Sequence, residues 1–497
     1  MTEKPKKAPY AMITVLMISD FIAMLNNTLL NVALPSMMAD LNLEATTIQW
    51  LVTGFMLVMG ILVPITAFLI QKFSVRHLFL TAMALFSAGA IVAGFAYTFP
   101  VLFAGRLLQA AGSSIVMPLL MNVMLVSFPA EKRGSAMGFL GLVMMGAPAI
   151  GPTLSGWVIQ HYDWRMLFHF ITPIAIASLI AGILILKDKK EKSSQTLDLF
   201  SVILSSFGFG GILYGLSSAG SKGWDTPHVY ISLIIGVTAL LFFVLRQIKM
   251  ERPMLNFEIF RYPMYTLSAA ISIILSMVMF SSMLLLPIYV QTLRGISPFQ
   301  AGLLMLPGAL MMALLSPITG KLFDKIGGRL LAVIGLSITV ITSYSFSQLT
   351  LDTPYLHLLL LYSSRMLGMA LVMMPVMTNG LNQLPARNYP HGTAMNSTLQ
   401  QISGAIGSSV LVTIMSIHTT SAAQDIAADM IKSGAVMTPE LQHQVSAQAM
   451  LKGINFSFLV TACVAVAALI LAFFIKRVTK ERQDQGEKAK RTSSLAS

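Results

Sequence analysis

The sequence predicts an all-α protein that crosses a membrane many times. Of its 497 residues, 55% are hydrophobic and only 11% are charged, and the mean hydropathy is +0.75. Soluble proteins of this length carry a larger charged fraction. A transmembrane helix needs about 20 apolar residues, and the chain contains fourteen such segments. They begin near residues 11, 48, 77, 100, 134, 166, 198, 229, 263, 298, 329, 354, 391 and 453.

The seventh and eighth segments have the weakest apolar pattern. Glycines interrupt the seventh segment, and the polar stretch from Ser217 to His228 separates it from the eighth. A second polar stretch, from His418 to Lys452, precedes the last segment. We expect this second stretch to be a solvated outer loop. A short amphipathic helix that covers the exit or contacts a partner is the alternative.

The basic residues fall mainly on one side of this topology. Cytoplasmic loops retain Lys and Arg, and most of the 33 basic residues lie on one side when the N-terminus is placed inside. We therefore expect both termini to be cytoplasmic. The four tryptophans then lie at or beyond the outer interface, where aromatic belts are typical. The net charge of +13 is spread over short loops, so it favours membrane orientation over nucleic-acid binding.

The chain also contains an internal repeat. Pro129–Met137 and Pro385–Met395 are similar, and each precedes a span. Upstream of each lies an arginine within a span, Arg106 or Arg365. Repeated halves are typical of transporters that work by alternating access, with the site between the halves. The predicted domains are two six-helix bundles, 1–186 and 263–475, a linker with two extra helices, 187–262, and a cytoplasmic basic tail, 476–497.

Three motifs resemble those of the major facilitator superfamily. The loop pattern Gly-x-Leu-x-Asp-x-x-Gly-x-Arg is complete at Gly320–Arg329. The segment Gly105–Gly112 is similar to the arginine motif of its proton antiporters, and Gly138–Gly156 is similar to the antiporter motif of its exporters. The resemblance covers essentially the whole chain. It implies the major facilitator fold and transport driven by an ion gradient.

Fourteen spans, the segment Leu25–Pro35 and the pair Trp164-Arg165 are similar to the drug:proton antiporter-2 family, of the EmrB and QacA type. Two positions depart from that pattern. Asn26, which cannot titrate, stands where the family usually has Asp in the first span. Gln71 stands where Asp is usual in the first-half copy of the loop motif.

Asp20 is the only acidic residue deep inside a predicted span. A charged side chain near the bilayer centre costs at least about 2.5 kcal/mol, so such a residue is a candidate functional site. We expect Asp20 to alternate between protonated and ionised forms, with Arg106 favouring the ionised one. The alternatives are that Asp20 fixes helix packing and that Arg106 holds helices together through carbonyl groups. Arg365 lacks the Gln that follows Arg106 in its motif, so we expect a structural role for it.

Four amide side chains are candidates for binding substrate. On a helix, Asn27 and Asn31 share a face with Asp20. Asn26 and Gln109 complete the set. Amide side chains of this kind either hydrogen-bond a substrate or join helices to one another, and the pattern leaves both roles open.

A further set of residues is expected to control conformational change. In the fifth span, Gly and Pro permit close helix approach and bending. In the loop motif, Gly permits a sharp turn, and Asp324 is expected to stabilise the start of the following span. The residues are Gly151, Pro152, Gly156, Gly320, Asp324, Gly327 and Arg329.

The sequence contains no phosphate loop, nucleophile elbow or metal-ligand spacing, so we predict neither an enzyme nor a cofactor or metal site. The resemblance predicts an exporter of the bacterial cytoplasmic membrane that exchanges protons for drugs or toxic compounds. With a single intramembrane carboxylate, the substrates are expected to be amphipathic and neutral or monocationic. The alternatives are a dedicated exporter of an endogenous lipid, fatty acid or peptide-like metabolite, and a non-transporting receptor or scaffold. The 35 methionines either line an adaptable apolar pocket or face lipid and neighbouring helices.

Overall fold

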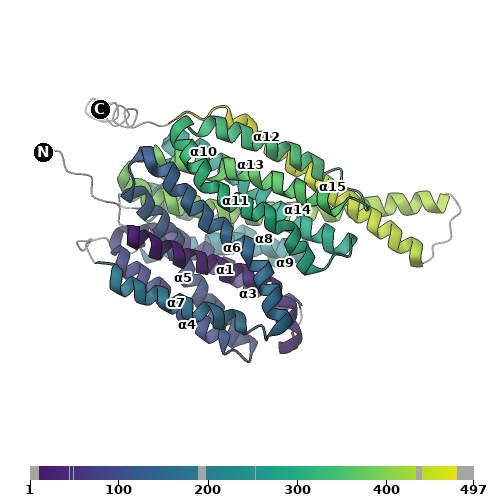
Figure 1. The fold of residues 1–497 in the computed structure, drawn as a ribbon, viewed down its shortest axis with the longest axis horizontal. Coiled ribbons are helices and arrows are strands. Elements are labelled where there is room, and N and C mark those ends of the chain that lie inside the picture. The colour runs from purple at the N-terminus through teal and green to yellow at the C-terminus, as the bar shows by residue number, and fades with distance from the viewer. Residues whose placement is uncertain are drawn as a thin grey trace.

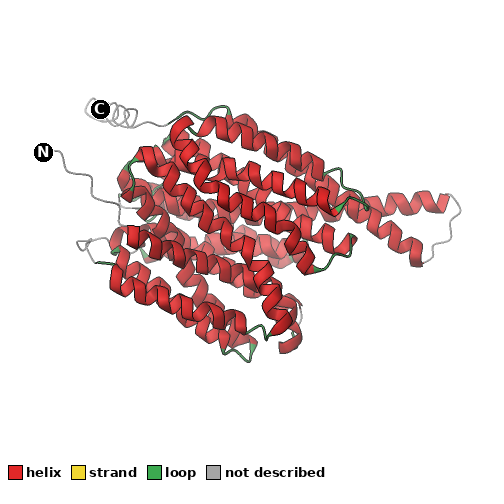
Figure 2. Cartoon of the chain, in the orientation of Figure 1, coloured by secondary structure: helices red, strands yellow, loops and turns green. Residues whose placement is uncertain are grey.

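A computed structural model describes residues 10–43, 45–48, 50–187, 198–251, 253–432 and 439–477. Within these residues the chain folds as long helices joined by short connections, with no strands (Figures 1 and 2). Fourteen of the helices are long and apolar enough to cross a membrane, which confirms the predicted number. Residues 188–197 and most of the predicted tail, 476–497, lie outside the described residues.

The first six spans are α1 (Tyr10–Leu41), α3 (Trp50–Lys72), α4 (Val75–Gly94), α5 (Phe99–Ser127), α6 (Arg133–His161) and α7 (Met166–Ile185), with the short α2 (Ala45–Ile48) after α1. The two additional spans are α8 (Leu199–Lys222) and α9 (Pro227–Lys249). The last six are α10 (Pro263–Ile288), α11 (Pro298–Ile326), α12 (Gly328–Phe346), α13 (Tyr355–Asn382), α14 (Tyr389–Lys432) and α15 (Pro439–Ala472).

Local sequence explains where several helices begin and end. Proline occupies the first turn of α5, α9, α10 and α11, where its missing N–H has no intrahelical partner to lose. Ser74 and Ser297 cap α4 and α11 by accepting backbone N–H bonds. Gly327 adopts φ +85° between α11 and α12, a conformation that glycine reaches without steric cost.

The expectation of a solvated loop from His418 to Lys452 is wrong for its described part. There α14 and α15 continue as a helical hairpin that projects beyond the other helices, at the right of Figure 1. Buried Ala422, Val445 and Ala449 lie between its exposed polar residues. The stretch is rich in Ala and Gln, which favour helix. Hydropathy therefore marked where the apolar segment begins, at residue 453, and missed the polar start of the helix.

The two sets of six helices meet along two seams. The most extensive contact joins α6 to α11, and on the other seam α3 contacts α14. The domain division proposed from the repeat stays a prediction. In both seams one partner comes from the first set of six helices and the other from the last set.

The helix α8 covers the seam between α3 and α14. On the α3 side, the ring of Trp50 stacks on Tyr214 with centroids 5.7 Å apart. A Cβ placed on Gly60 would lie 2.1 Å from Cδ1 of Leu213, so this leucine fills the notch that Gly60 leaves. On the α14 side, Ser409 donates a hydrogen bond to the carbonyl of Leu216. Thus α8 binds both halves, while α9 packs on α8 and is largely exposed.

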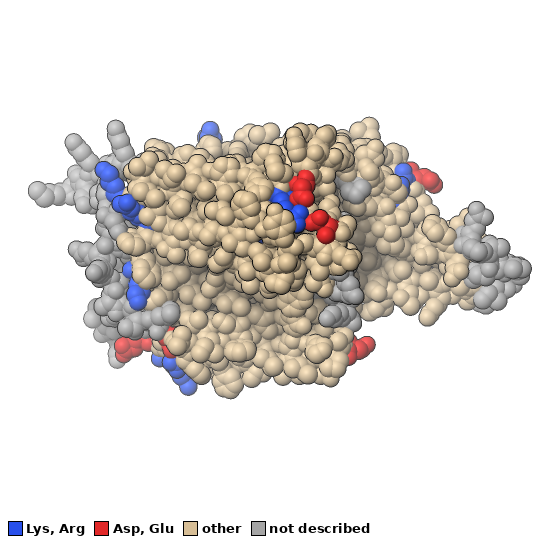
Figure 3. All heavy atoms as spheres, turned by 90° about the horizontal axis from the view of Figure 1, so that it is seen from below, with Lys and Arg blue, Asp and Glu red and all other residues tan. Residues whose placement is uncertain are grey.

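The charged side chains on the face shown in Figure 3 are unevenly placed. Most of the visible Lys and Arg lie at the end of the bundle where α1 begins and α15 ends, on the left in that view. The broad surface beyond them is mainly uncharged, apart from one cluster of basic and acidic side chains near its middle and a few charged side chains toward the right. A basic end is typical of the cytoplasmic side, and the orientation of the termini stays a prediction.

Candidate functional site

Two amide side chains join α1 to α5 inside the first half. Asn26 donates through Nδ2 to Oε1 of Gln109 at 3.1 Å, and Gln109 donates through Nε2 to Oδ1 of Asn26 at 3.4 Å. Both side chains are buried. The pair forms a reciprocal amide contact of the kind that joins helices in membranes.

Arg106 extends this amide pair into a network. Its Nη1 donates to Oε1 of Gln109 at 3.0 Å, and its Nη2 donates to Oδ1 of Asn27 at 3.3 Å. The guanidinium also stacks on the ring of Phe55 on α3, 4.4 Å from the centroid, which is a favourable cation–π distance. The side chain is 0% exposed. Four predicted site residues therefore lie together, and they hold Arg106 with neutral acceptors.

Asp20 lies outside this network. It is 2% exposed, on α1 almost two turns from Asn26, and its Oδ2 has no hydrogen-bond partner. Among the described residues, the hydrogen-bond acceptors of Arg106 are Asn27 and Gln109, and no ion pair joins it to Asp20. A protonated carboxyl is the form that is least costly to bury without a partner. The side chain of Asn31 lies outside the described part of α1.

The glycine-rich span α6 packs closely on α1. A Cβ on Gly151 would lie 2.3 Å from Oγ1 of Thr28, so only glycine fits there. Ser155 donates to the carbonyl of Leu29 at 2.7 Å. Pro152 and Gly156 face α11 instead. A Cβ on Gly302 would lie 3.7 Å from Cβ of Pro152, and a Cβ on Gly156 would lie 3.6 Å from Cδ2 of Phe299. Both are ordinary van der Waals distances.

The loop motif makes a latch between the halves, which we define as Asp324 with Gly134 and Ser135. The Asp324 carboxylate accepts from the backbone N–H of Gly134 at 2.8 Å and of Ser135 at 2.8 Å, and from the Ser135 hydroxyl at 2.6 Å. The prediction that Asp324 stabilises the start of the following span is wrong. Asp324 lies in the last turn of α11, and its carboxylate binds the start of α6, where the first N–H groups have no partner within their own helix.

Glycine lets the two backbones touch beside this latch. A Cβ on Gly320 would lie 2.1 Å from the carbonyl oxygen of Gly134, and one on Gly138 would lie 2.4 Å from that of Ser316. The remaining motif residue, Arg329, is exposed. Nearby, Arg477 donates to the backbone carbonyls of Asp324 and Lys325, so the chain after α15 returns to the latch.

A second contact stands at the equivalent place on the other seam. Gln71 of α3 and His391 of α14 have their Nε2 atoms 2.6 Å apart, and His391 accepts through Nδ1 from the backbone N–H of Asn256 at 3.2 Å. From the sequence, His391 could titrate, but an isolated histidine of this kind is interpreted as a bystander. The signal was available, because the repeat pairs Gln71 with Asp324 and the start of α14 with the start of α6.

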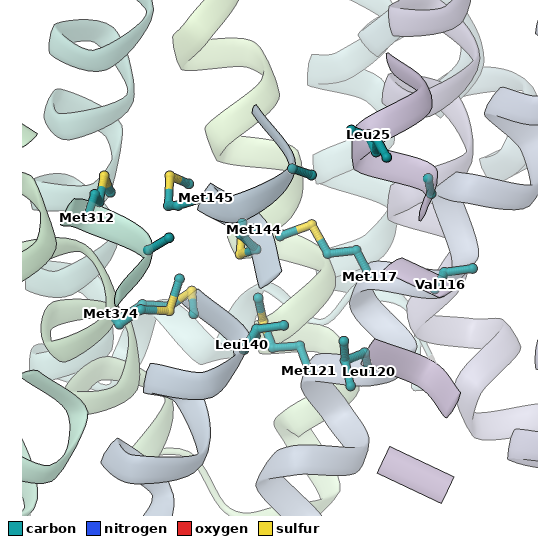
Figure 4. Close-up of a cluster of buried hydrophobic side chains, with 14 of the residues drawn as sticks. Leu25, Val116, Met117, Leu120, Met121, Leu140, Met144, Met145, Met312 and Met374 are labelled. Atoms are coloured by element: carbon teal, nitrogen blue, oxygen red, sulfur yellow. The ribbon is translucent and has the colours of Figure 1, made fainter. Parts of the chain in front are cut away.

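Methionine fills much of the space between the halves (Figure 4). Met144 and Met145 of α6 are buried together with Met312 of α11 and Met374 of α13. Met117 extends the cluster toward α1. Flexible, polarisable side chains of this kind can repack against changing neighbours.

Trp164 and Arg165 join loops at the end opposite the latch. Arg165 forms ion pairs with Asp40 at 2.9 Å and Asp163 at 3.1 Å, and its Nε donates to the carbonyl of Ala96 at 2.9 Å. Trp164 donates to the Asp40 carboxylate at 3.2 Å. This pair therefore ties the end of α1 to two loops of the same half.

Comparison with known proteins identifies the family. The model of the Major Facilitator Superfamily matches residues 16–408. An uncharacterized MFS-type transporter, YhcA of Bacillus subtilis (strain 168), is 46% identical over 97% of this chain and 95% of its own length. The lincomycin resistance protein LmrB of the same organism is 42% identical over 93% of this chain and 95% of its own length. The solved structure of the proton:xylose symporter XylE shares the fold, with a TM-score of 0.63, 12% identity and coverage of 95% and 97%.

These relatives are transporters, and the fourteen apolar helices make the chain a multi-pass protein of the bacterial plasma membrane. The members of this family are transporters and not enzymes. The chain belongs to the major facilitator superfamily.

Proposed function

We propose that this protein exports amphipathic drugs or other toxic compounds across the cytoplasmic membrane in exchange for protons. The observation that carries the proposal is the buried Asp20 carboxyl, whose Oδ2 lacks a partner. A carboxyl in this setting is a proton site by default. The similarity to a lincomycin resistance protein supports export of drugs, and no cofactor beyond the proton gradient is required.

Asp20 carries the proton in this proposal, and Arg106 senses the conformation. While Asn27 and Gln109 hold Arg106, Asp20 is stable in its protonated form. A rocking motion that brings the guanidinium toward Asp20 stabilises the ionised form and releases the proton. The proton affinity of one site thus depends on which side is open, which is the requirement for coupling.

The latch provides the gate. In this conformation Asp324 holds α6 at the end that carries the predicted cytoplasmic loops, so substrate entry from that side requires the latch to open. The polar network of Asn26, Asn27 and Gln109, with the methionines between the halves, forms the proposed substrate path. Neutral and monocationic amphiphiles fit a path with one intramembrane carboxyl.

Transport by Asp20→Asn in proteoliposomes tests the proposal. With a pH gradient imposed, wild type is expected to move lincomycin or ethidium, and Asp20→Asn to lower the initial coupled rate by about tenfold or more. Exchange of substrate without a gradient should persist in the variant, because that reaction needs no net proton transfer. Asp352→Asn, in an exposed loop, is the matched control. Normal coupled export by Asp20→Asn at normal expression would remove Asp20 from the mechanism.

A further inference from the structure

His391 joins three segments of the chain where α14 begins. The side chain is 6% exposed. Its Nε2 lies 2.6 Å from the side-chain amide of Gln71 on α3, and its Nδ1 accepts from the backbone N–H of Asn256 at 3.2 Å. Asn256 belongs to the connector, by which we mean the residues between α9 and the short helix η2 (Phe257–Arg261). One imidazole therefore contacts the first half, the second half and the connector.

The two contacts fix where the ring proton lies. A neutral imidazole has one N–H donor and one bare acceptor nitrogen. Because Nδ1 accepts from Asn256, Nε2 carries the proton, and Gln71 presents its amide oxygen to that N–H. The contacts of these three residues, which we call the His391 junction, therefore require the neutral ring.

A second proton on this ring would break one contact and keep the other. The imidazolium is a donor at both nitrogens, so Nδ1–H would oppose the N–H of Asn256. Nε2 would still donate to Gln71, and its charge would strengthen that bond. The backbone carbonyl of Met254 also interacts with the ring and offers the charged form an acceptor. Protonation therefore releases the N–H of Asn256 while α3 and α14 stay joined.

A charged group occupies the equivalent position in the first copy of the repeat. His391 and Arg133 each stand directly before the glycine of their repeat motif. Arg133 donates through Nη1 to Oδ1 of Asn382 at 3.2 Å, and through Nε to the carbonyl of Phe128 at 3.1 Å. Its guanidinium also stacks on the ring of Tyr389, 4.8 Å from the centroid. One copy of the repeat thus carries a permanent charge here, and the other carries a group that titrates.

The charged and titratable groups around the junction leave the ring without an ion pair. They are Lys72 on α3, Arg133 on α6, Asp198 before α8, Arg246 and Lys249 on α9, Glu251 in the connector, Glu258 and Arg261 on η2, Tyr265 on α10, Arg387 before α14, and Lys476 and Arg477 after α15. Asp198 and Glu258 pair with arginines of their own surroundings, and no ion pair of the described residues includes His391. Solution pH and the hydrogen bonds of the junction therefore decide the charge of the ring.

We infer that the His391 junction is a second proton-binding site, separate from Asp20, at which one proton frees the connector from α14. The junction lies where α3 ends and α14 begins, at the predicted cytoplasmic end. The connector leads from the two additional spans into the second half, so a fall in cytoplasmic pH loosens that tie. The inference goes beyond the proposed export, because it needs neither Asp20 nor a substrate.

Amide hydrogen exchange of the full chain in lipid nanodiscs tests the site. Two neighbouring amides serve as probe and reference. Asn256 donates to the titratable ring, whereas Leu255 donates to Oε1 of Gln247 on α9 at 3.1 Å, and an amide does not titrate. Residue-resolved exchange, divided by the intrinsic rate, is measured from about pH 8 to about pH 4, which spans the titration of imidazole. The protection of Asn256 should fall by about tenfold or more, while that of Leu255 stays within about twofold.

Two variants connect this fall to the ring of His391. His391→Asn keeps an amide oxygen near the position of Nδ1 but cannot gain a proton, so the protection of Asn256 should no longer depend on pH. Gln71→Glu places a carboxylate against Nε2 and favours the charged ring, so the midpoint of the fall should rise by about one pH unit or more. Gln300→Glu, at the exposed start of α11, adds the same charge elsewhere and should leave the midpoint in place.

Constant protection of Asn256 in the wild type would overturn the site, and so would an equal fall in His391→Asn. A histidine that only fills space would leave the midpoint unmoved in Gln71→Glu. An unshifted midpoint therefore also overturns the site, which keeps the test valid if His391→Asn misfolds. Joint loss of protection at Leu255 and Asn256 would indicate general opening and would overturn it as well. The assay involves no transport, so a failure of proton-coupled export shows only in the Asp20→Asn experiment.

Discussion

At the scale of single residues, the amide network explains how this chain keeps a buried arginine without an acid beside it. Arg106 has two neutral acceptors and one aromatic face, and Gln109 serves both Arg106 and Asn26. Asn26 occupies the position where the similar drug:proton antiporters have Asp. A carboxylate at residue 26 would therefore lie beside Gln109, the same side chain that accepts a hydrogen bond from Arg106.

This arrangement predicts a rescue. Asn26→Asp in an Asp20→Asn background should restore proton-coupled export to about tenfold or more above that of Asp20→Asn alone. The new carboxylate gains a titratable proton and a charged neighbour in Arg106. Coupled uptake of protons in proteoliposomes measures the effect, with Asn122→Asp on α5 as the control for an acid placed elsewhere in the bundle. An inactive double variant that folds normally would show that depth in the membrane, and not the presence of an acid, decides the proton site.

At the scale of helices, contact between α6 and α11 varies along the pair. Gly320 meets the backbone of α6 directly, whereas Gly302 on the same helix faces Pro152 at an ordinary van der Waals distance. The latch adds three hydrogen bonds to one carboxylate at the close end. Closure at that end therefore depends on glycine as much as on charge.

Two alanine substitutions on α11 test this difference. Gly320→Ala should disfavour the latched conformation, because its Cβ would collide with the carbonyl oxygen of Gly134. Gly302→Ala should be neutral or stabilising, by up to about 1 kcal/mol, because alanine favours helix and space is available. Spin labels at Lys132 and Lys321, in a Cys463→Ser background, report the separation at the latch end. Unchanged distances in Gly320→Ala would contradict the requirement for glycine.

Hydropathy and the repeat predicted much of this arrangement. Apolar segment length fixed fourteen spans, and thirteen of them start within two residues of the predicted position. The repeat singled out Arg106, Arg365 and Asp324. The partners of these residues were beyond reach, because Asp324 and Ser135 are 189 residues apart in sequence and no local pattern encodes their contact. The polar start of α15 was missed because amphipathic packing within a hairpin carries little hydropathy signal.

At the scale of the whole molecule, α8 contacts both halves, which the proposed alternating access would move relative to each other. Its contacts with α3 are ring stacking and a filled notch at Gly60, whereas its contacts with α14 include the hydrogen bond from Ser409. The packing of α8 on α3 buries apolar area and does not depend on the direction of a hydrogen bond, unlike its contact with α14. We therefore expect α8 to remain with the first half during transport.

Cross-links can test which half α8 follows. A disulfide between Gly60→Cys and Leu213→Cys, in a Cys463→Ser background, should leave transport within about twofold of wild type, because no contact has to break. Trp224, in the turn after α8, donates to the hydroxyl of Thr413 on α14. A short bifunctional thiol reagent that joins Trp224→Cys to Thr413→Cys, added to the first link, should lower transport by about tenfold or more. The same variants under reducing conditions, without reagent, are the controls. Full transport with both links in place would show that α8 does not bridge moving bodies.

The two additional spans, α8 and α9, also bear on how a fourteen-span transporter arises from a twelve-span plan. Two spans return the chain to the side that it left, so the second half keeps its orientation in the bilayer, which a single inserted helix would invert. Since α9 packs mainly on α8 and is largely exposed, the pair needs few new complementary surfaces. A single insertion event can therefore lengthen the protein without re-evolving the core of either half.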